Sequence, residues 1–333
     1  MPGSTPSISV VMPVYNAAPY LRRALDSVCH QTFRDLEILC VHDGSTDGSP
    51  AILAEYAARD ARIRLIDHGE NRGYACAMNT GFDAATGETV GIVDADDAIS
   101  KNFFAELWKV YEKGGCDITK GRRVEREQDG RWHEKGLNAA IQKDALAFSY
   151  EWTTAIYRTS LLRRYGLSLA PEVASGQDTL FLMQLMGHEP RLAFSDQAIY
   201  YYFRNGASMT RAHPEEYYLA NDLKIASLLK KYLPAYPAVS QRQRMFRRIL
   251  GFLDYSLNDR FGQCDCSPCL MEIQAILADD EFYAPQASFP FLRKALEATN
   301  IREVKAALKA STGYLVASSL REGLRVKPSC PVR

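Results

Sequence analysis

Short apolar runs alternate with segments of helical periodicity through the first 125 residues of the chain. Runs rich in valine, isoleucine and leucine are typical of strands, and apolar residues three or four positions apart predict helices. The predicted strands cover residues 8–15, 36–43, 62–68, 89–96 and 117–124. The predicted helices cover residues 19–31, a segment from about Asp47, residues 72–85 and a segment from Ser100. Because the strands are apolar enough to be buried on both faces, the alternation predicts an α/β fold, a mostly parallel sheet flanked by helices.

The pattern changes after about residue 215, and helical periodicity then continues to the end of the chain. We therefore expect an α/β domain in residues 1–215 and a helical C-terminal region in residues 216–333. The segment QRQRMFRRILGFLDYSL, residues 241–257, is basic on one side and apolar on the other. Such a helix either packs on the preceding domain with its charges in solvent, or contacts an anionic membrane surface.

Carboxylates gather where the predicted strands end. Asp43 follows the second strand in DGSTDGS, and Asp94 and Asp96 form a DxD pattern after the fourth strand in GIVDADD. Ligands of parallel sheets bind beyond the carboxyl ends of the strands, and a buried carboxylate without a partner is costly. A divalent cation that prefers hard oxygen ligands, Mg²⁺ or Mn²⁺, would offset this charge. The alternative is that these residues form only turns and helix caps, which Asp, Ser and Gly favour.

Composition narrows the choice of partners and location. The 333 residues include 40 basic and 40 acidic ones, a balance that predicts no nucleic-acid partner. The N-terminal segment lacks the features of a signal peptide, and no apolar run approaches the roughly 20 residues of a spanning helix. We therefore expect a cytoplasmic protein. The segment from Ile301 is locally basic and includes Arg321, Arg325 and Lys327, which favours peripheral contact with the inner face of the membrane.

The eight cysteines are scattered along the chain and are expected to be reduced thiols. Three of them, Cys264, Cys266 and Cys269, form a CxCxxC cluster. No second pair of Cys or His residues lies at the spacing of a zinc finger, so a loop with free thiols is preferred to a zinc site.

Two long stretches of the chain resemble one known family. SVVMPVYNAAPYLRRALDSVCHQTFRDLEILCVHDGSTDGS and ENRGYACAMNTGFDAATGETVGIVDADD are similar to the nucleotide-sugar half of the inverting family-2 glycosyltransferases, which have the GT-A fold. The resemblance is dense from Ile8 to Leu107 and returns in SGQDTLFLMQLMGHEP and AIYYYFRNGASMTR. It implies metal-dependent, inverting transfer of a sugar from a nucleotide-diphosphate sugar, with a UDP-sugar expected, to a hydroxyl of a glycan or lipid-linked glycan. The implied pathway is surface polysaccharide or lipopolysaccharide biosynthesis.

The resemblance also assigns roles to residues at the strand ends. Pro13 and Tyr15 would form the wall around the nucleotide base, and Asp43 would hydrogen-bond to the base. Asp94 would contact the ribose or the water shell of the metal. Asp96 would ligate the metal, which bridges the two phosphates of the donor.

On the acceptor side, the resemblance points to Asp178. Displacement with inversion needs a base that takes the proton of the attacking hydroxyl, and Asp178 is the candidate. The alternative is that Asp178 is the N-cap of the helix that follows it. Many relatives have Glu-Asp where this chain has Gln177-Asp178, and Arg-Asn where it has Met78-Asn79. A phosphate contact by that arginine is therefore lost or replaced.

Other positions keep two interpretations. Arg72 faces the donor or is an exposed loop arginine. Arg204 lies where comparable transferases close over the diphosphate, and His213 is a metal ligand or a solvent histidine that caps a helix. Asp97 is a weaker candidate for the metal site than Asp96, or it caps the helix beginning near Ser100.

Two other classes of protein fit less well. A sugar-nucleotide pyrophosphorylase would need a glycine-rich phosphate loop with Lys or Arg after the first strand, and YNAAPYLRRA is not one. A non-catalytic sugar-nucleotide-binding module would have no reason to keep Asp178.

Overall fold

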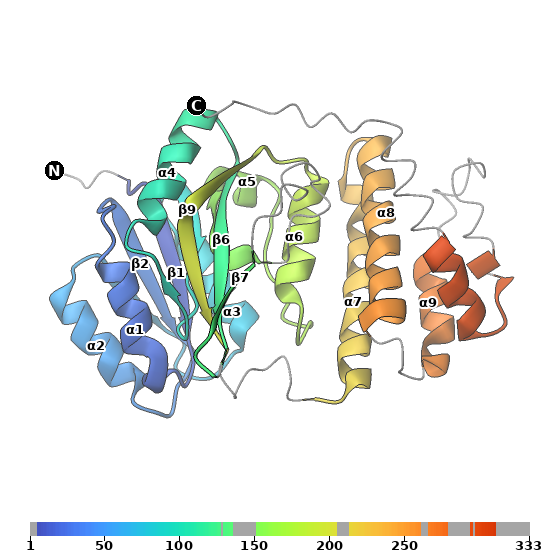
Figure 1. Ribbon diagram of the computed structural model, residues 1–333, viewed down its shortest axis with the longest axis horizontal. Helices are drawn as coiled ribbons and strands as arrows, with labels where there is room; N and C mark the ends of the chain where they lie inside the picture. Colours follow the sequence, from blue (N-terminus) through green and yellow to red (C-terminus); the bar gives the residue numbers. More distant parts are fainter. Residues whose placement is uncertain are drawn as a thin grey trace. The chain divides into compact units, whose positions relative to one another are not determined.

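The computed structural model describes residues 5–127, 129–135, 151–204, 213–260, 266–278, 294–295 and 297–310. These residues form two compact units, and each is described by itself. The first unit contains a sheet with helices α1 to α5, and the second contains helices α6 to α9 (Figure 1). The domain boundary at residue 215 stays a prediction; α6 precedes that position and belongs to the second unit.

The first unit is built on a mixed sheet. Its strands are β1 (Ile8–Val14), β2 (Leu36–His42), β3 (Ile63–Asp67), β4 (Thr89–Ile92), β5 (Ala98–Ile99), β6 (Ile118–Arg126), β7 (Trp132–Lys135), β8 (Ala155–Arg158) and β9 (Leu192–Phe203). Their order is β3-β2-β1-β4-β8-β6-β9-β5, and β7 pairs with β6. The five predicted strands are confirmed as β1, β2, β3, β4 and β6. The sheet is less parallel than predicted, because the short strands β5, β7 and β8 pair antiparallel with their neighbours.

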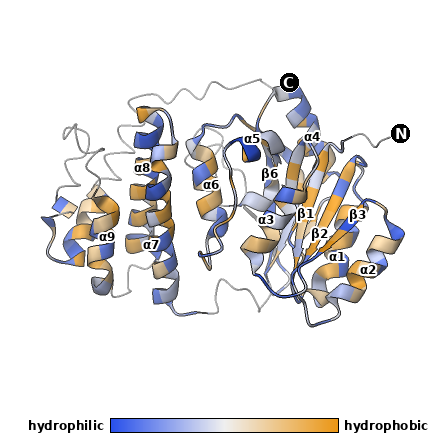
Figure 2. Ribbon diagram, turned by 180° about the vertical axis from the view of Figure 1, so that it is seen from behind, coloured by the Kyte–Doolittle hydropathy of each residue, from blue (hydrophilic) through white to orange (hydrophobic). Residues whose placement is uncertain are grey.

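Helices of the first unit flank this sheet. They are α1 (Ala18–Cys29), α2 (Ser49–Arg59), α3 (Tyr74–Ala84), α4 (Phe103–Gly114) and α5 (Thr159–Arg164). In α1 the buried residues are Leu21, Ala24, Leu25 and Val28, whose spacing places them on one face. All seven residues of β1 are buried, and β1 and β2 are mostly hydrophobic in Figure 2. The prediction of strands buried on both faces is confirmed for β1, β2 and β4 but is wrong for β3, in which only Ile63 is buried.

Six described strands run in the same direction. β1 is parallel to β2 and β4, β2 is parallel to β3, and β6 is parallel to β9. Because β8 is antiparallel to both β4 and β6, the pair β6 and β9 runs in the direction of β4. The carboxyl ends of the six strands share one edge of the sheet, called the carboxyl edge below. Their amino ends share the opposite edge, called the amino edge.

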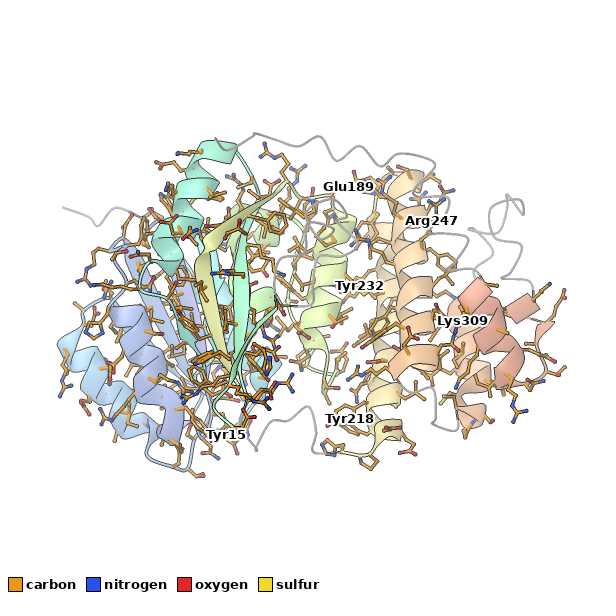
Figure 3. The ribbon with its side chains drawn as sticks, viewed as in Figure 1. Tyr15, Glu189, Tyr218, Tyr232, Arg247 and Lys309 are labelled. Carbon is orange, nitrogen blue, oxygen red and sulfur yellow. The ribbon has the colours of Figure 1, made fainter. Side chains whose placement is uncertain are left out.

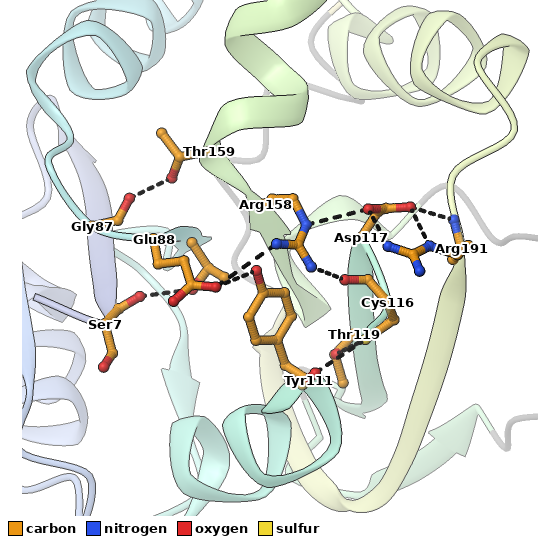
Figure 4. A network of polar contacts seen from close by, with 11 residues as sticks. Ser7, Gly87, Glu88, Tyr111, Cys116, Asp117, Thr119, Arg158, Thr159 and Arg191 are labelled. Carbon is orange, nitrogen blue, oxygen red and sulfur yellow. Dashed lines mark hydrogen bonds and ion pairs between the residues drawn. The ribbon is translucent and has the colours of Figure 1, made fainter. Parts of the chain in front are cut away.

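A charged network joins the elements of the amino edge (Figure 4). The Asp117 carboxylate accepts hydrogen bonds from Arg158 Nε at 3.2 Å and from the backbone N–H of Arg191 at 2.9 Å. Arg158 Nη1 lies 3.8 Å from Glu88, which accepts a hydrogen bond from the Tyr111 hydroxyl at 2.9 Å. Burial acts to raise the pKa of Asp117, but the hydrogen bonds from Arg191 and the charges of both arginines outweigh it and lower the pKa.

The second unit is helical in its described part. Its helices are α6 (Gln177–Gly187), α7 (Glu215–Tyr232), α8 (Val239–Asp254) and α9 (Leu270–Leu277), and residues 301–310 are also helical. α8 confirms the predicted helix over residues 241–257, and a π-helical segment, Tyr255–Arg260, follows it. Among the helices described in either unit, none is both long and apolar enough to cross a membrane.

Some predictions fall outside the described residues. Cys264 and the basic residues Arg321, Arg325 and Lys327 are in this group. Cys266 and Cys269 are described, and neither forms a disulfide bond.

Candidate functional site

The carboxyl edge brings together the ends of β1, β2 and β4. Pro13 is buried within β1, and Tyr15 follows that strand with 49% of its surface exposed (Figure 3). Asp43 directly follows β2, and Asp94 lies two residues after β4. β1 pairs with both β2 and β4, so the three segments are neighbours at this edge. Four predicted site residues therefore meet where the order of the strands places them.

Asp43 anchors the turn between β3 and α3. It is 2% exposed, and its Oδ1 lies 2.7 Å from His68 Nδ1 and accepts the Arg72 backbone N–H at 2.9 Å. Its Oδ2 accepts the Gly73 backbone N–H at 2.9 Å. His68 Nε2 in turn lies 2.9 Å from the Thr80 hydroxyl. A carboxylate has about four acceptor positions, so these bonds leave Asp43 with capacity for one more donor.

Gly44 allows that turn to pass close to the end of β2. Its φ of +65° is a conformation that residues with a Cβ rarely adopt. A Cβ at this position would also lie 2.4 Å from the backbone nitrogen of Asn71. The DG pair of DGSTDGS therefore makes a tertiary contact as well as a local turn.

Residues 94–97, called the acidic turn below, connect β4 to β5. Asp94 and Asp96 are partly exposed, and Asp97 is 1% exposed. Asp94 Oδ1 accepts a hydrogen bond from the Tyr74 hydroxyl at 2.8 Å. The backbone carbonyl of Asp96 accepts one from the guanidinium of Arg23 on α1. Two of the three acidic residues thus retain exposed surface at the carboxyl edge.

Asp97 is bound to β9. Its Oδ2 accepts the Tyr200 hydroxyl at 2.8 Å, and its Oδ1 accepts the Phe203 backbone N–H at 3.0 Å. Burial, and then the charges of the other two carboxylates in the turn, raise the pKa of Asp97 well above its ordinary value. The prediction that Asp97 caps the following helix is wrong, because the N-cap of α4 is Asn102.

The two arginines predicted at the donor site differ in their contacts. The Arg72 side chain is exposed, and its backbone N–H is the group that binds Asp43. Arg204 directly follows β9, and its Nε and Nη2 donate to Glu125 Oε2 at 3.1 and 2.8 Å. Its Nε also lies 3.3 Å from Glu127. The hydrogen bond with Glu125 raises the pKa of Arg204. Arg204 is therefore held at the end of β6 by carboxylates.

Asp178 belongs to the second unit, in the first turn of α6. Its Oδ1 accepts the backbone N–H of Thr179 at 2.8 Å. The N-cap is Gly176, so the alternative that Asp178 is itself the N-cap is wrong, although a negative charge in the first turn favours the helix. Gln177 donates through its side-chain amide to the carbonyl of Val173.

His213 also belongs to the second unit and is exposed. Its ring centroid lies 4.0 Å from that of Tyr217, and its backbone N–H donates to the Tyr218 hydroxyl at 3.2 Å. Pro214 is the N-cap of α7, so the prediction that His213 caps this helix is wrong.

The acidic turn is the part of the described chain that suits a metal ion. No cluster of three or more His, Cys, Asp or Glu side chains in the described residues is arranged to hold one. Asp94 and Asp96 provide two carboxylates, and both of Asp97's oxygens accept hydrogen bonds from β9. Mg²⁺ is commonly bound by one or two carboxylates together with water and substrate phosphates. The residues present therefore fit an ion whose other ligands come from a phosphate-bearing molecule.

Sequence patterns do not reveal four residues that organise the carboxyl edge. These are Arg23, His68, Tyr74 and Tyr200. Arg23 is 73 positions from Asp96, and Tyr200 is 103 positions from Asp97. Periodicity reports neighbours within one element, so it carries no signal for such pairs. His68 is marked by its place at the end of a predicted strand, but that place does not identify its partner.

Comparison with known proteins points to one family. Residues 9–171 match the family model described as Glycosyl transferase family 2. EpsJ of Bacillus subtilis (strain 168), an uncharacterized glycosyltransferase, is 32% identical over 219 residues, which cover 62% of this chain and 63% of EpsJ. The chain thus spans slightly less than two thirds of the length of that relative.

Two solved structures share the fold. S. aureus TarS 1–349 in complex with UDP-GlcNAc has a TM-score of 0.68 at 21% identity, over 96% of this chain and 93% of that one. Mannosyltransferase PcManGT from Pyrobaculum calidifontis, in complex with GDP-Man and Mn²⁺, has a TM-score of 0.53 at 19% identity, over 98% and 89%. The predicted GT-A fold is confirmed. Residues 9–171 therefore form a domain of glycosyltransferase family 2.

Proposed function

We propose that the chain is a glycosyltransferase that moves a sugar from a nucleotide-diphosphate sugar to a hydroxyl of a glycan or lipid-linked glycan, with inversion. The donor is a UDP-sugar, and the pathway is surface polysaccharide or lipopolysaccharide biosynthesis. The family-2 domain and the relatives named as glycosyltransferases support the reaction. The fold shared with TarS, which was solved with UDP and with UDP-GlcNAc, supports the donor.

One observation carries this proposal. β1, β2 and β4 end side by side, so Tyr15, Asp43 and the acidic turn lie at the same edge of one sheet. A nucleotide-diphosphate sugar needs a surface for its base and a charged site for its diphosphate. Tyr15 and Pro13 provide the surface, and the remaining acceptor capacity of Asp43 suits an N–H of the base. The acidic turn provides the charged site.

A divalent ion, Mn²⁺ or Mg²⁺, belongs to this proposal. Asp96 would hold it, with Asp94 as a further ligand directly or through water. When bound, the ion supplies positive charge that stabilises the diphosphate leaving group. The Mn²⁺ in the PcManGT complex supports this choice of ion. His213, whose ring packs on Tyr217, is retained as a proposed further ligand.

Asp178 is proposed as the general base, and Arg72 and Arg204 as donor contacts. An ordinary aspartate has a pKa near about 3.9 and is a weak base. It becomes effective when it accepts the proton of the acceptor hydroxyl late in the reaction, as that oxygen becomes acidic. The exposed side chain of Arg72 is accessible to a diphosphate at the carboxyl edge.

Peripheral membrane contact is a separate part of the proposal. Arg321, Arg325 and Lys327 would each contribute about 1 kcal/mol of attraction near an anionic surface. Sedimentation with phosphatidylserine vesicles should therefore be weaker after replacing all three with alanine, while turnover on a soluble acceptor is retained. Equal sedimentation of the wild type and the triple variant would contradict the proposed membrane contact.

A donor panel tests the main proposal. The purified protein is incubated with UDP-, GDP- and dTDP-sugars, with and without MnCl₂, and release of the nucleoside diphosphate is measured. We expect release of UDP that requires Mn²⁺ and rises when a hydroxyl acceptor is added. Turnover undiminished in excess chelator would contradict the metal assignment. Donor binding without any release would favour the non-catalytic binding module.

A further inference from the structure

Arg23 of α1 contacts two segments of the first unit that are far from it in sequence. Its guanidinium donates a hydrogen bond to the backbone carbonyl of Asp96. The same guanidinium lies 3.5 Å from the centroid of the Phe203 ring, on the last residue of β9. A planar guanidinium both stacks on an aromatic face and directs its N–H groups, which an ammonium group cannot do. Arg23 therefore fixes Asp96 relative to α1 and β9.

These contacts form a closed loop around Asp96. Phe203, whose ring carries Arg23, donates its backbone N–H to Asp97 Oδ1 at 3.0 Å. Asp97 directly follows Asp96, whose carbonyl is bound to Arg23. The Asp96 backbone is thus held through Arg23 on one side and through Asp97 on the other.

The position of Arg23 has an energetic cost. Its Nε is buried and has no hydrogen-bond partner among the described residues. A buried donor without a partner is unfavourable, and burial acts to lower the pKa of this arginine while the charges of Asp97 and Asp96 act to raise it. An arginine placed here at such a cost suggests a task beyond stabilising α1.

We propose that Arg23 is a positioning residue for Asp96: it holds the Asp96 backbone so that the carboxylate is presented to a divalent ion and a donor diphosphate. This inference rests on the proposed function. Charge and position act in opposite directions here, because a cation next to a metal site repels the metal, whereas a fixed ligand binds it better. Removing Arg23 should therefore weaken metal binding if its main role is positioning, and tighten metal binding if its main effect is charge repulsion.

The test compares Arg23→Met with Arg22→Met. Arg22 is the preceding residue on α1, is 52% exposed in its side chain and pairs with Glu55 at 2.6 Å, so it is a matched control. Mn²⁺ binding to the metal-free full chain in the presence of UDP is measured by titration calorimetry. We expect Arg23→Met to bind Mn²⁺ about tenfold more weakly, the size typical of groups that orient a ligand. Arg22→Met should stay within about twofold, since surface ion pairs contribute little. Unchanged or tighter binding in Arg23→Met would overturn the proposal.

A second variant covers the case in which Arg23→Met folds poorly. Arg23→Lys keeps the charge but loses the planar group and its paired donors. It should also weaken Mn²⁺ binding, and by at least as much as methionine does, because lysine keeps the charge that repels the metal. Wild-type affinity in Arg23→Lys would show that charge alone matters, and would overturn the positioning role.

Hydrogen exchange provides a readout that needs neither metal nor sugar. The Asp97 N–H donates to the Asp94 carbonyl at 3.1 Å, and the Phe203 N–H donates to Asp97. Both amides should exchange faster in Arg23→Met than in Arg22→Met. If the wild type bound no Mn²⁺ even in the presence of UDP, the metal assignment of the proposed function would fail, and hydrogen exchange alone would test the role of Arg23. Equal exchange in the two variants would contradict that role.

Discussion

The two edges of the sheet use carboxylates in opposite ways. At the amino edge, Asp117 is bonded to Arg158 and Arg191, and its pKa is lowered because the arginines outweigh the effect of burial. At the carboxyl edge, Asp97 lies beside two more carboxylates, and burial and those charges raise its pKa. Both edges belong to one sheet, so the difference comes from the partners of each carboxylate.

This difference separates residues that stabilise the fold from residues placed for a ligand. A carboxylate that forms ion pairs within the protein stabilises the folded state, and its removal leaves the arginines without their partner. Like charges gathered in one turn act against folding, and perturbed carboxylates of this kind cluster at functional sites. The comparison predicts that substitutions at the amino edge lower stability, and that substitutions in the acidic turn lower activity.

The largest effect is expected for Asp96→Asn. Asparagine has almost the same shape but no charge, so the ion that would stabilise the diphosphate leaving group loses a charged ligand. Transfer should fall by about 100-fold or more, the size seen when a group that stabilises developing charge is removed. UDP release with the donor identified by the panel measures the effect.

Asp117→Asn is the matched control at the amino edge. It also removes one carboxylate charge, but beside Arg158 and Arg191. In Asp117→Asn the melting temperature should fall, and turnover below that temperature should be retained. In Asp96→Asn the melting temperature should be retained, and turnover should fall. If both variants lost activity at equal folded fraction, the two edges would not differ in function as the comparison predicts.

Asp178→Asn tests a carboxylate that belongs to neither edge. If Asp178 is the base, donor binding should stay within about threefold while transfer falls by about 100-fold, because asparagine keeps the shape and cannot accept the proton. Its bond to the Thr179 N–H is one that an asparagine oxygen can also accept, so the helix should be stable. If Asp178→Asn transferred sugar to the true acceptor at nearly the wild-type rate, Asp178 would not be the general base.

Gln177→Glu sharpens the same test. It introduces the Glu-Asp pair that the family resemblance leads us to expect and adds a negative charge beside Asp178, which should raise the pKa of that base. The Gln177 amide donates to the Val173 carbonyl, and glutamate would lose this bond. A stronger base favours transfer, whereas loss of the bond to Val173 disfavours it. Because the two effects oppose each other, we expect only a modest change in transfer rate, measured by the same assay.

The strands and the placement of the acidic residues follow from the sequence because they depend on local patterns. The apolar runs locate β1 to β4, and strand ends of a parallel sheet share an edge, so Asp43, Asp94 and Asp96 are found together. β5 has only two residues, too few for a periodic signal.

Tertiary partners account for the errors at the site. Asp97 lies a few residues before a helix, which locally indicates a cap, yet its carboxylate binds Tyr200 and Phe203 of a strand about 100 positions away. The sequence also suggests that a metal must offset all the charge of the acidic turn. In the structure, Arg23 and a raised pKa of Asp97 offset part of it.

A smaller effect is expected from Arg158→Met at the amino edge. Arg158 bonds to Asp117 and to the Cys116 carbonyl, at 3.2 and 2.7 Å, and its side chain is 27% exposed. Its loss should lower the free energy of unfolding by about 2 kcal/mol, measured by urea denaturation. Arg131→Met is the control, because the Arg131 and Asp129 side chains are 74% and 48% exposed and such pairs contribute roughly 0–1 kcal/mol. If both variants lost the same free energy of unfolding, the more buried ion pair would contribute no more to stability than the exposed one.

The smallest expected effect is the pH dependence of the Asp117 contribution. The folded-state pKa of Asp117 is lowered, while an aspartate in the unfolded chain titrates near about 3.9. A group of this kind stabilises the fold above its unfolded pKa, and the contribution is lost as the pH falls through the folded pKa. The difference in free energy of unfolding between wild type and Asp117→Asn should therefore be complete above about pH 5 and shrink below about pH 4. Urea denaturation of both proteins across this range measures it. A difference that stayed constant or grew on acidification would show that the arginines do not hold Asp117 charged, and the contrast between the two edges would lose its electrostatic basis.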